Sequence, residues 1–150
     1  MSLNANLIKE IRENSGAGIV DCKNALLQND YDVEKSIDRL RKKGLSVAAK
    51  KSGRVAAEGL VGVHIDNNNA CLIEINSETD FVSRNEQFQK FVTDCSKIAL
   101  ATDGNLDSLL SSNYIESDNS VADELTKNVA TIGENLNIRR VEKITLWSMC

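Results

Sequence analysis

The feature that most limits the fold of this chain is a change in hydrophobic period near Val55. Before it, apolar residues recur three or four positions apart, which is typical of helices. After it they alternate between Val61 and Ile75, which is typical of strands, and a helical period then returns. This order predicts an α+β chain in two parts: a three-helix bundle with a basic connector over residues 1–53, and an α+β core subdomain over residues 54–150.

Three short helices are expected in the first part. The first ends at the Gly16-Ala17-Gly18 turn, and the second contributes Ala25 and Leu26 to the core. The third begins after Asp32 as its N-cap and ends at Gly44. The apolar stripe of the first helix is Leu3, Leu7, Ile8 and Ile11, and that of the third is Val33, Ile37 and Leu40.

The connector from Leu45 to Arg54 is basic, although the chain as a whole carries a net charge of −4. Residues 39–54 contain no acid, and their basic members are Arg39, Arg41, Lys42, Lys43, Lys50, Lys51 and Arg54. Charge runs are usually solvated faces, so we interpret the connector as a helical linker. A docking contact for an acidic partner surface is the alternative.

A β-hairpin with one buried face is expected next. Two apolar triplets alternate on either side of the turn at residues 66–69, and we expect both to face the core. The triplets are Val61, Val63 and Ile65, then Cys71, Ile73 and Ile75. The single histidine, His64, should then lie on the opposite face, and nothing near it suggests a catalytic or ligand role.

Two long helices and a final strand complete the second part. Ser83 and Glu86 have capping-box spacing for the first of these helices, and Ser120 opens the second. Their stripes are Phe88, Phe91, Val92, Cys95, Ile98 and Ala99, then Val121, Leu125, Val129, Ile132 and Leu136. The last strand should run from Asn137 through Trp147. Together these elements predict a small antiparallel sheet packed against a helical hairpin.

Between the hairpin and the next helix lies a corner, residues 77–82, that should be polar throughout. It nevertheless carries Phe81 and Val82 beside the acidic residues Glu78 and Asp80. An apolar side chain at such a corner either folds back into the core or is offered to a partner. The residues alone favour burial of Phe81.

Several classes of function are disfavoured by composition. The chain lacks an apolar run of the length that spans a bilayer, and it shows no secretory signal pattern. Its four cysteines form no CxxC motif, so a structural zinc site is not expected, and Cys71 and Cys95 are interpreted as buried free thiols. Without a P-loop, HExxH or GxSxG motif, the chain is not expected to be an enzyme or to carry a cofactor.

Three segments resemble one family in order and spacing: Ser15-Gly-Ala-Gly-Ile-Val-Asp-Cys-Lys23, Asn76-Ser-Glu-Thr-Asp-Phe-Val-Ser-Arg84 and Ile132-Gly-Glu-Asn-Leu-Asn-Ile-Arg-Arg140. The connector segments 40–45 and 48–51 match it as well. The family is elongation factor Ts, and the resemblance reaches the end of the first half of its core domain. Family members usually carry Met where this chain has Ile19 and Val20.

The resemblance implies a guanine-nucleotide exchange factor for the translational GTPase elongation factor Tu. In the family, the Gly-turn and second helix of a module like a ubiquitin-associated domain dock on the GTPase, and the Thr-Asp-Phe corner disturbs its magnesium and phosphate site. Carried over by position, the partner-binding residues are Ile19, Val20, Asp21, Lys23, Lys50, Lys51, Thr79, Asp80, Phe81 and Val82.

The resemblance further implies a bacterial cytoplasmic protein, or one of an organellar matrix or stroma. No membrane and no direct nucleic-acid partner are expected, and a homodimer is left open. The alternative function is a non-catalytic module that binds nucleic acid through residues 39–54 or a scaffold through the three-helix bundle. Against nucleic-acid binding stand the acidic net charge and the low aromatic content of 4%.

Overall fold

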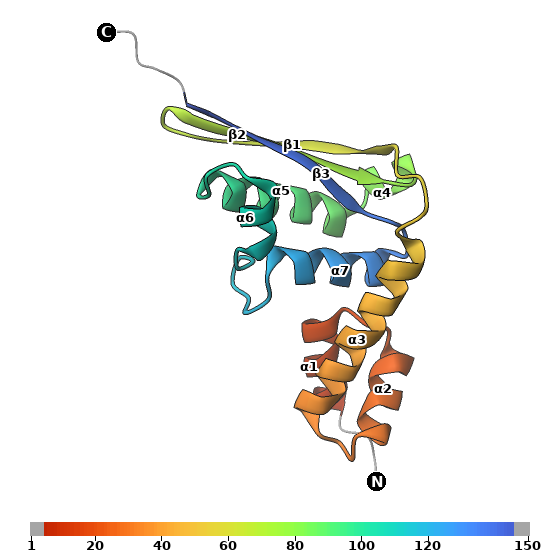
Figure 1. Ribbon diagram of the computed structural model, residues 1–150. Coiled ribbons are helices and arrows are strands. Elements are labelled where there is room, and N and C mark those ends of the chain that lie inside the picture. The colour runs from red at the N-terminus through yellow and green to blue at the C-terminus, as the bar shows by residue number, and fades with distance from the viewer. Residues whose placement is uncertain (1–4, 146–150) are drawn as a thin grey trace, which may run out of the picture. The chain divides into compact units, whose positions relative to one another are not determined.

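The structure, a computed structural model, describes residues 5–145. Its contacts group the chain into two units: one runs up to Gly53 and includes Thr126–Glu134, and the other comprises Arg54–Leu125 and continues from Asn135. The first unit is helical and the second contains the sheet (Figure 1), so the α+β class is confirmed. The expectations for Leu3 and Trp147 lie outside the described residues.

The first unit contains a three-helix bundle, as predicted. Its helices are α1 (Ala5–Ser15), α2 (Ile19–Gln28) and α3 (Val33–Lys51). Its buried core consists of Ile11, Cys22, Ala25, Leu26 and Leu40, with Leu7, Ile8, Val33 and Ile37 packed partly buried against it. All three predicted stripes therefore contribute to one small core.

Helix α3 begins where the sequence predicts and ends seven residues later than predicted. The Asp32 carboxylate accepts a hydrogen bond from the backbone N–H of Lys35 at 3.0 Å, which confirms the N-cap. The predicted stop at Gly44 is wrong, because the helix continues to Lys51. A lone glycine costs a helix only about 1 kcal/mol relative to alanine. The good helix formers on either side of Gly44 outweigh that cost.

The second unit contains an antiparallel sheet in the order β1-β2-β3. The strands are β1 (Glu58–Asp66), β2 (Asn69–Ser77) and β3 (Asn137–Thr145). A two-residue turn joins β1 to β2, with Asn67 at a φ of 52° and Asp66 paired with Asn69. This turn confirms the hairpin and fixes its register.

The register corrects the predicted face of β1. It pairs His64 with Cys71 and Gly62 with Ile73, so these residues share the inner face with the buried triplet of β2. Val61, Val63 and Ile65 therefore lie on the opposite face, and all three are exposed. A β-carbon on Gly62 would lie 2.7 Å from Cγ1 of Val92, so a glycine stands where the covering helix passes closest to β1.

A register shift between Glu74 and Ile75 determines which side chains of β3 face the core. Ile138 pairs with Ile75 and Arg140 pairs with Glu74, which leaves Arg139 as an extra residue in β3. Ile138 and Val141 are three positions apart, yet the bulge lets both side chains face the core.

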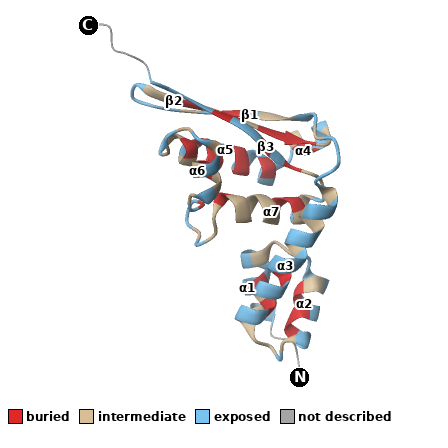
Figure 2. Ribbon diagram, in the orientation of Figure 1, coloured by how far each residue is buried: buried red, intermediate tan, exposed pale blue. Residues whose placement is uncertain are grey.

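Helix α5 (Glu86–Leu100) packs against β1 and β2, with α6 (Leu106–Ser111) beside it. Figure 2 shows the buried residues along α5 and in the sheet. The N-cap of α5 is Asn85, whose side chain accepts from the backbone N–H of Phe88 at 3.0 Å. The predicted capping role of Ser83 is wrong, because Ser83 belongs to a separate short helix. The second long helix, α7, spans Val121–Ile132.

Candidate functional site

The corner after β2 is a single helical turn, α4 (Asp80–Ser83), preceded by Thr79 in an extended conformation. Its two apolar side chains have opposite environments. Phe81 is 76% exposed, whereas Val82 is 7% exposed. Of the two positions considered for Phe81, the outward one is observed, against the preference of the residues alone. The aromatic ring is held at the surface of the second unit by a buried neighbour.

Hydrogen bonds fix this corner to the sheet. The Ser83 hydroxyl donates to the carbonyl oxygen of Gly59 at 3.2 Å, and the Ser77 hydroxyl donates to that of Thr79 at 2.9 Å. Gly59 has a φ of 134°, and a β-carbon there would lie 2.1 Å from the carbonyl oxygen of Ile75. Only glycine allows β1 to approach the end of β2 this closely.

Asp80 lies in the first turn of α4 and is exposed. Its carboxylate makes no ion pair or side-chain hydrogen bond within residues 5–145. It can therefore accept hydrogen bonds from another molecule. Thr79, Asp80 and Phe81 form the outward part of the corner, with Val82 beneath them.

A second exposed apolar surface lies in the first unit, on α2. Ile19, Val20 and Leu27 are all exposed there, and the predicted partner residue Lys23 lies between them. The sequence reasoning missed Leu27. A usable signal was present, because Leu27 follows Val20 by seven positions and Lys23 by four, so the three share a helix face.

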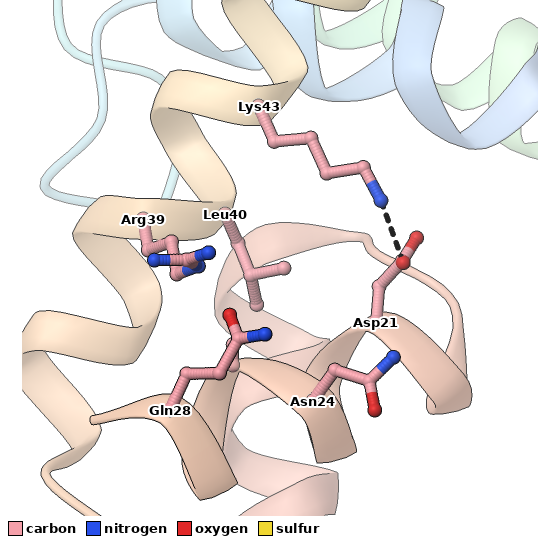
Figure 3. Close-up of a pocket in the computed structure, with 7 residues that line it drawn as sticks. Asp21, Asn24, Gln28, Arg39, Leu40 and Lys43 are labelled. Atoms are coloured by element: carbon pink, nitrogen blue, oxygen red, sulfur yellow. Dashed lines mark hydrogen bonds and ion pairs between the residues drawn. The ribbon is translucent and has the colours of Figure 1, made fainter.

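Asp21, the remaining predicted residue of α2, is engaged within the bundle. Its Oδ1 atom accepts from Lys43 Nζ at 2.6 Å (Figure 3). This ion pair crosses from α2 to α3 beside a pocket of about 380 Å³. The other residues that line the pocket are Asn24, Ala25, Gln28, Arg39 and Leu40.

Lys50 and Lys51 form the last turn of α3. Their positive charges complement the partial negative charge at the carboxyl end of a helix. Lys50 is exposed and Lys51 is half-buried. The structure therefore supports a helical connector.

The sequence reasoning also missed a buried polar network on α5. Oδ2 of Asp94 accepts from the hydroxyl of Tyr114 at 2.7 Å and from Lys90 Nζ at 2.6 Å. Desolvation, followed by the bond to Asp94, raises the pKa of Tyr114, so this hydroxyl stays protonated as a donor. The network fastens the segment after α6 to α5 and stays apart from the corner.

The predicted buried thiols are present in the structure. Cys71 and Cys95 are free and buried, as predicted, and Cys22 is as well. Burial raises the pKa of the Cys95 thiol, which disfavours the reactive thiolate. Across residues 5–145, no set of three or more His, Cys, Asp or Glu side chains is placed to hold a metal ion. In the same range, no helix combines the length and apolar character needed to cross a membrane.

Comparison with known proteins shows where such a chain belongs. A family described as Elongation factor TS matches residues 78–149, a range that starts at the corner. Elongation factor Ts of Parvibaculum lavamentivorans is 51% identical over 144 residues, which cover 96% of this chain and 47% of the relative. Elongation factor Ts of Sphingopyxis alaskensis is 54% identical over 149 residues, 97% of this chain and 47% of the relative. Elongation factor Ts of Methylobacterium radiotolerans is 50% identical over 143 residues, which cover 95% of this chain and 46% of the relative.

These matches confirm the resemblance drawn from the three sequence segments. The chain spans about half the length of the curated relatives it matches. Within that span the identity is close to half of all positions. On these matches, the chain is similar to elongation factor Ts over nearly all of its own length.

Proposed function

We propose that this chain is a guanine-nucleotide exchange factor that promotes GDP release from elongation factor Tu. The observation that carries the proposal is the position of Phe81, which is 76% exposed on a hydrogen-bonded corner. An exposed aromatic ring on a rigid support is suited to insertion between packed elements of a partner. The family relationship supplies the class of partner.

The mechanism is one of coupled binding, and no covalent bond changes. GDP is held largely through its phosphates and a magnesium ion, which requires near-ideal octahedral geometry. A ring pushed between helices beside that site shifts the elements that hold the ion, because packed interiors rearrange in discrete steps. The factor and GDP then weaken each other's binding to the same extent.

The α2 surface supplies the docking contact in this proposal. Ile19 and Val20 offer apolar area, Lys23 offers charge, and Leu27 extends the same face. Asp21 contributes through its ion pair with Lys43, which fixes α2 against α3. Lys50 and Lys51 add positive charge to the docking contact. Thr79 and Asp80 bind the partner beside Phe81, and Val82 holds the ring from beneath.

The proposed role needs no catalytic residue and no cofactor in this chain. The GTPase carries the nucleotide and the metal, and the chain acts by binding alone. Since the relatives are bacterial proteins, the proposed place of action is the bacterial cytoplasm, where translation occurs.

The test measures release of fluorescently labelled GDP from elongation factor Tu after mixing with excess unlabelled GDP. The wild-type chain is expected to accelerate release, and Phe81→Ala should abolish most of that effect. Val61→Ala, which trims another exposed apolar side chain of the same unit, is the matched control and should leave the acceleration in place. Binding without acceleration by the wild-type chain would refute the proposed function.

A further inference from the structure

A compact polar cluster forms around Glu78, near the start of the corner. Oε1 of Glu78 accepts from the backbone N–H of Asn135 at 2.7 Å and lies 3.5 Å from Nη1 of Arg54. The Asn135 side chain in turn donates from Nδ2 to the carbonyl oxygen of Arg54 at 2.8 Å. Three residues that are distant in sequence thus form a closed ring of contacts, here called the Arg54–Glu78–Asn135 cluster.

The cluster is built to constrain its members. The Glu78 side chain is only 21% exposed, so its ion pair with Arg54 is partly shielded from water. A carboxylate that accepts from a backbone N–H makes a charge-assisted hydrogen bond, which is stronger than one between neutral groups. The bond from Asn135 to Arg54 involves a backbone carbonyl, so the cluster fixes main chain as well as side chains.

The position of Glu78 connects this constraint to the corner. One residue, Thr79, separates it from the first residue of α4. On the far side of α4, Ser83 is bonded to Gly59. The corner is therefore held at both ends, by Glu78 where the chain enters it and by Ser83 where the chain leaves it.

An outward phenylalanine needs such restraint. Burying an aromatic side chain is favourable, so a free corner would gain by folding Phe81 back toward apolar surface. Val82 is already buried on the inner side of the same turn. Anchoring the side chains of Glu78 and Ser83, one on each side of Phe81 and Val82, opposes the rotation of the turn that would exchange these two side chains.

We propose that Glu78 is a positioning residue, which acts with Arg54 and Asn135 to hold residues 79–82 so that Phe81 faces outward. Through Asn135, the segment Ile132–Arg140 then helps to hold the corner. Arg54 has the same function, which the other basic residues of 39–54 do not share in this proposal. Its consequence for nucleotide exchange rests on the proposed function, whereas its consequence for the order of the corner does not.

The first test measures hydrogen–deuterium exchange of the amides of Arg84 and Asn85 in the free chain. These amides bond to the carbonyl oxygens of Phe81 and Val82 at 3.1 and 2.9 Å, so they report on the turn. Glu78→Ala is expected to speed their exchange by about tenfold, since local opening becomes easier. Glu78→Gln keeps an acceptor for Asn135 and should show a smaller increase.

Glu74→Ala is the matched control. Glu74 lies on β2, four residues before Glu78, and its side chain is 18% exposed. Its carboxylate pairs with Arg139 and Arg140 of β3 at 3.7 and 3.3 Å, and these ion pairs do not involve Arg54 or Asn135. Loss of the Glu74 carboxylate should leave the exchange rates of the Arg84 and Asn85 amides unchanged. Unchanged exchange in Glu78→Ala, or equal acceleration in both alanine variants, would overturn the proposal.

Asn135→Ala guards against a folding failure of Glu78→Ala. It removes only the side-chain bond to Arg54, so it should loosen the same amides to a smaller extent. If neither Asn135→Ala nor Glu78→Gln changes their exchange, the proposal is overturned.

The second test separates positioning from docking. In the GDP-release assay, Glu78→Ala should lower the maximal release rate by about tenfold, because misplacing a contact group costs rate steeply. The concentration for half-maximal effect should change little, since the α2 surface is untouched. A changed half-maximal concentration with an unchanged maximal rate would contradict the inference. If the wild-type chain accelerates nothing, the proposed function fails, and amide exchange alone then decides the inference.

Discussion

Phe81 and Val82 are one position apart on a helical turn, and that position decides whether the side chain is exposed or buried. The two side chains are neighbours of similar character, yet the first is 76% and the second 7% exposed. The sequence could not separate them, because a four-residue turn carries too few residues for a periodicity to be recognised. The direction of α4 is instead set by contacts with Gly59 and Asn135, which lie far away in the chain.

Alanine substitution should reduce the stability much more at Val82 than at Phe81. Phe81→Ala should change the free energy of unfolding by less than about 0.5 kcal/mol, as is usual for exposed sites. Val82→Ala should lower it by roughly 1–2 kcal/mol, because it removes buried methyl groups. Urea denaturation of both variants checks this. A larger loss for Phe81→Ala would mean that the ring is packed in the free protein.

The Tyr114 hydroxyl makes a buried hydrogen bond to a carboxylate of α5. Tyr114→Phe keeps the ring, which stacks on Phe91 at a centroid distance of 6.0 Å, but it removes the donor to Asp94. The loss should cost roughly 1.5–3 kcal/mol, as expected for a buried hydrogen bond to a charged group. Thermal or urea unfolding measures it.

Tyr31→Phe is the control for this change. The Tyr31 hydroxyl makes no hydrogen bond within residues 5–145, although its ring packs on the bundle core. Its removal should leave stability within about 0.5 kcal/mol of wild type. Equal losses in both variants would show that the Asp94 network contributes little.

At the scale of elements, the helices and strands were largely predictable and the faces of the sheet were not. The periodicity located α5 and α7, and the asparagine-rich turn located the hairpin. Both apolar triplets were nevertheless assigned to the core. A two-residue hairpin that pairs Asp66 with Asn69 fixes every other pair, because the residue numbers of two partners then add up to 135. Val63 is therefore paired with Leu72, and the two side chains face the same side of the sheet. The turn length already excluded burial of both triplets on one face.

The polar residues of the sheet and its corner were harder to predict. The bulge at Arg139 and the contacts of Glu78 depend on residues far apart in sequence, which a single chain pattern does not reveal. The site residues came from a resemblance, and the structure then located them. Leu27 shows that helical spacing could have extended the α2 set without it.

The start of α3 gives a prediction that depends on pH. The Lys35 N–H bond, as the largest cause, lowers the pKa of Asp32 below its usual value of 3.8. A lowered pKa in the folded state means that the stabilisation is present above pH 3.8 and disappears as pH falls through the folded pKa. Asp32→Asn still caps the helix but does not titrate. The stability advantage of wild type over this variant should therefore shrink as the pH falls below about 3.8.

Urea midpoints of both proteins across this pH range provide the measurement. Asp38→Asn, which removes an exposed carboxylate from the interior of the same helix, is the control. An advantage of wild type that stays constant with pH would show that the cap acts without its charge.

At the scale of the whole molecule, both units expose apolar side chains. The first unit presents Ile19, Val20 and Leu27 on α2, and the second presents Phe81 at the corner as well as the outer face of β1. Among the described residues, neither the α2 surface nor the corner includes a metal ligand set or an exposed thiol. A partner that contacts both surfaces would gain from their linkage in one chain.

The proposed exchange function requires that this chain and GDP weaken each other's binding to the GTPase, and one comparison of affinities measures that coupling. The affinity of the chain for elongation factor Tu is measured with the GTPase free of nucleotide and again with it saturated by GDP and magnesium. The account predicts binding about a thousandfold weaker in the presence of GDP, which corresponds to roughly 4 kcal/mol of coupling. Phe81→Ala should reduce that ratio toward one. Equal affinity of the wild-type chain for both forms would contradict the account.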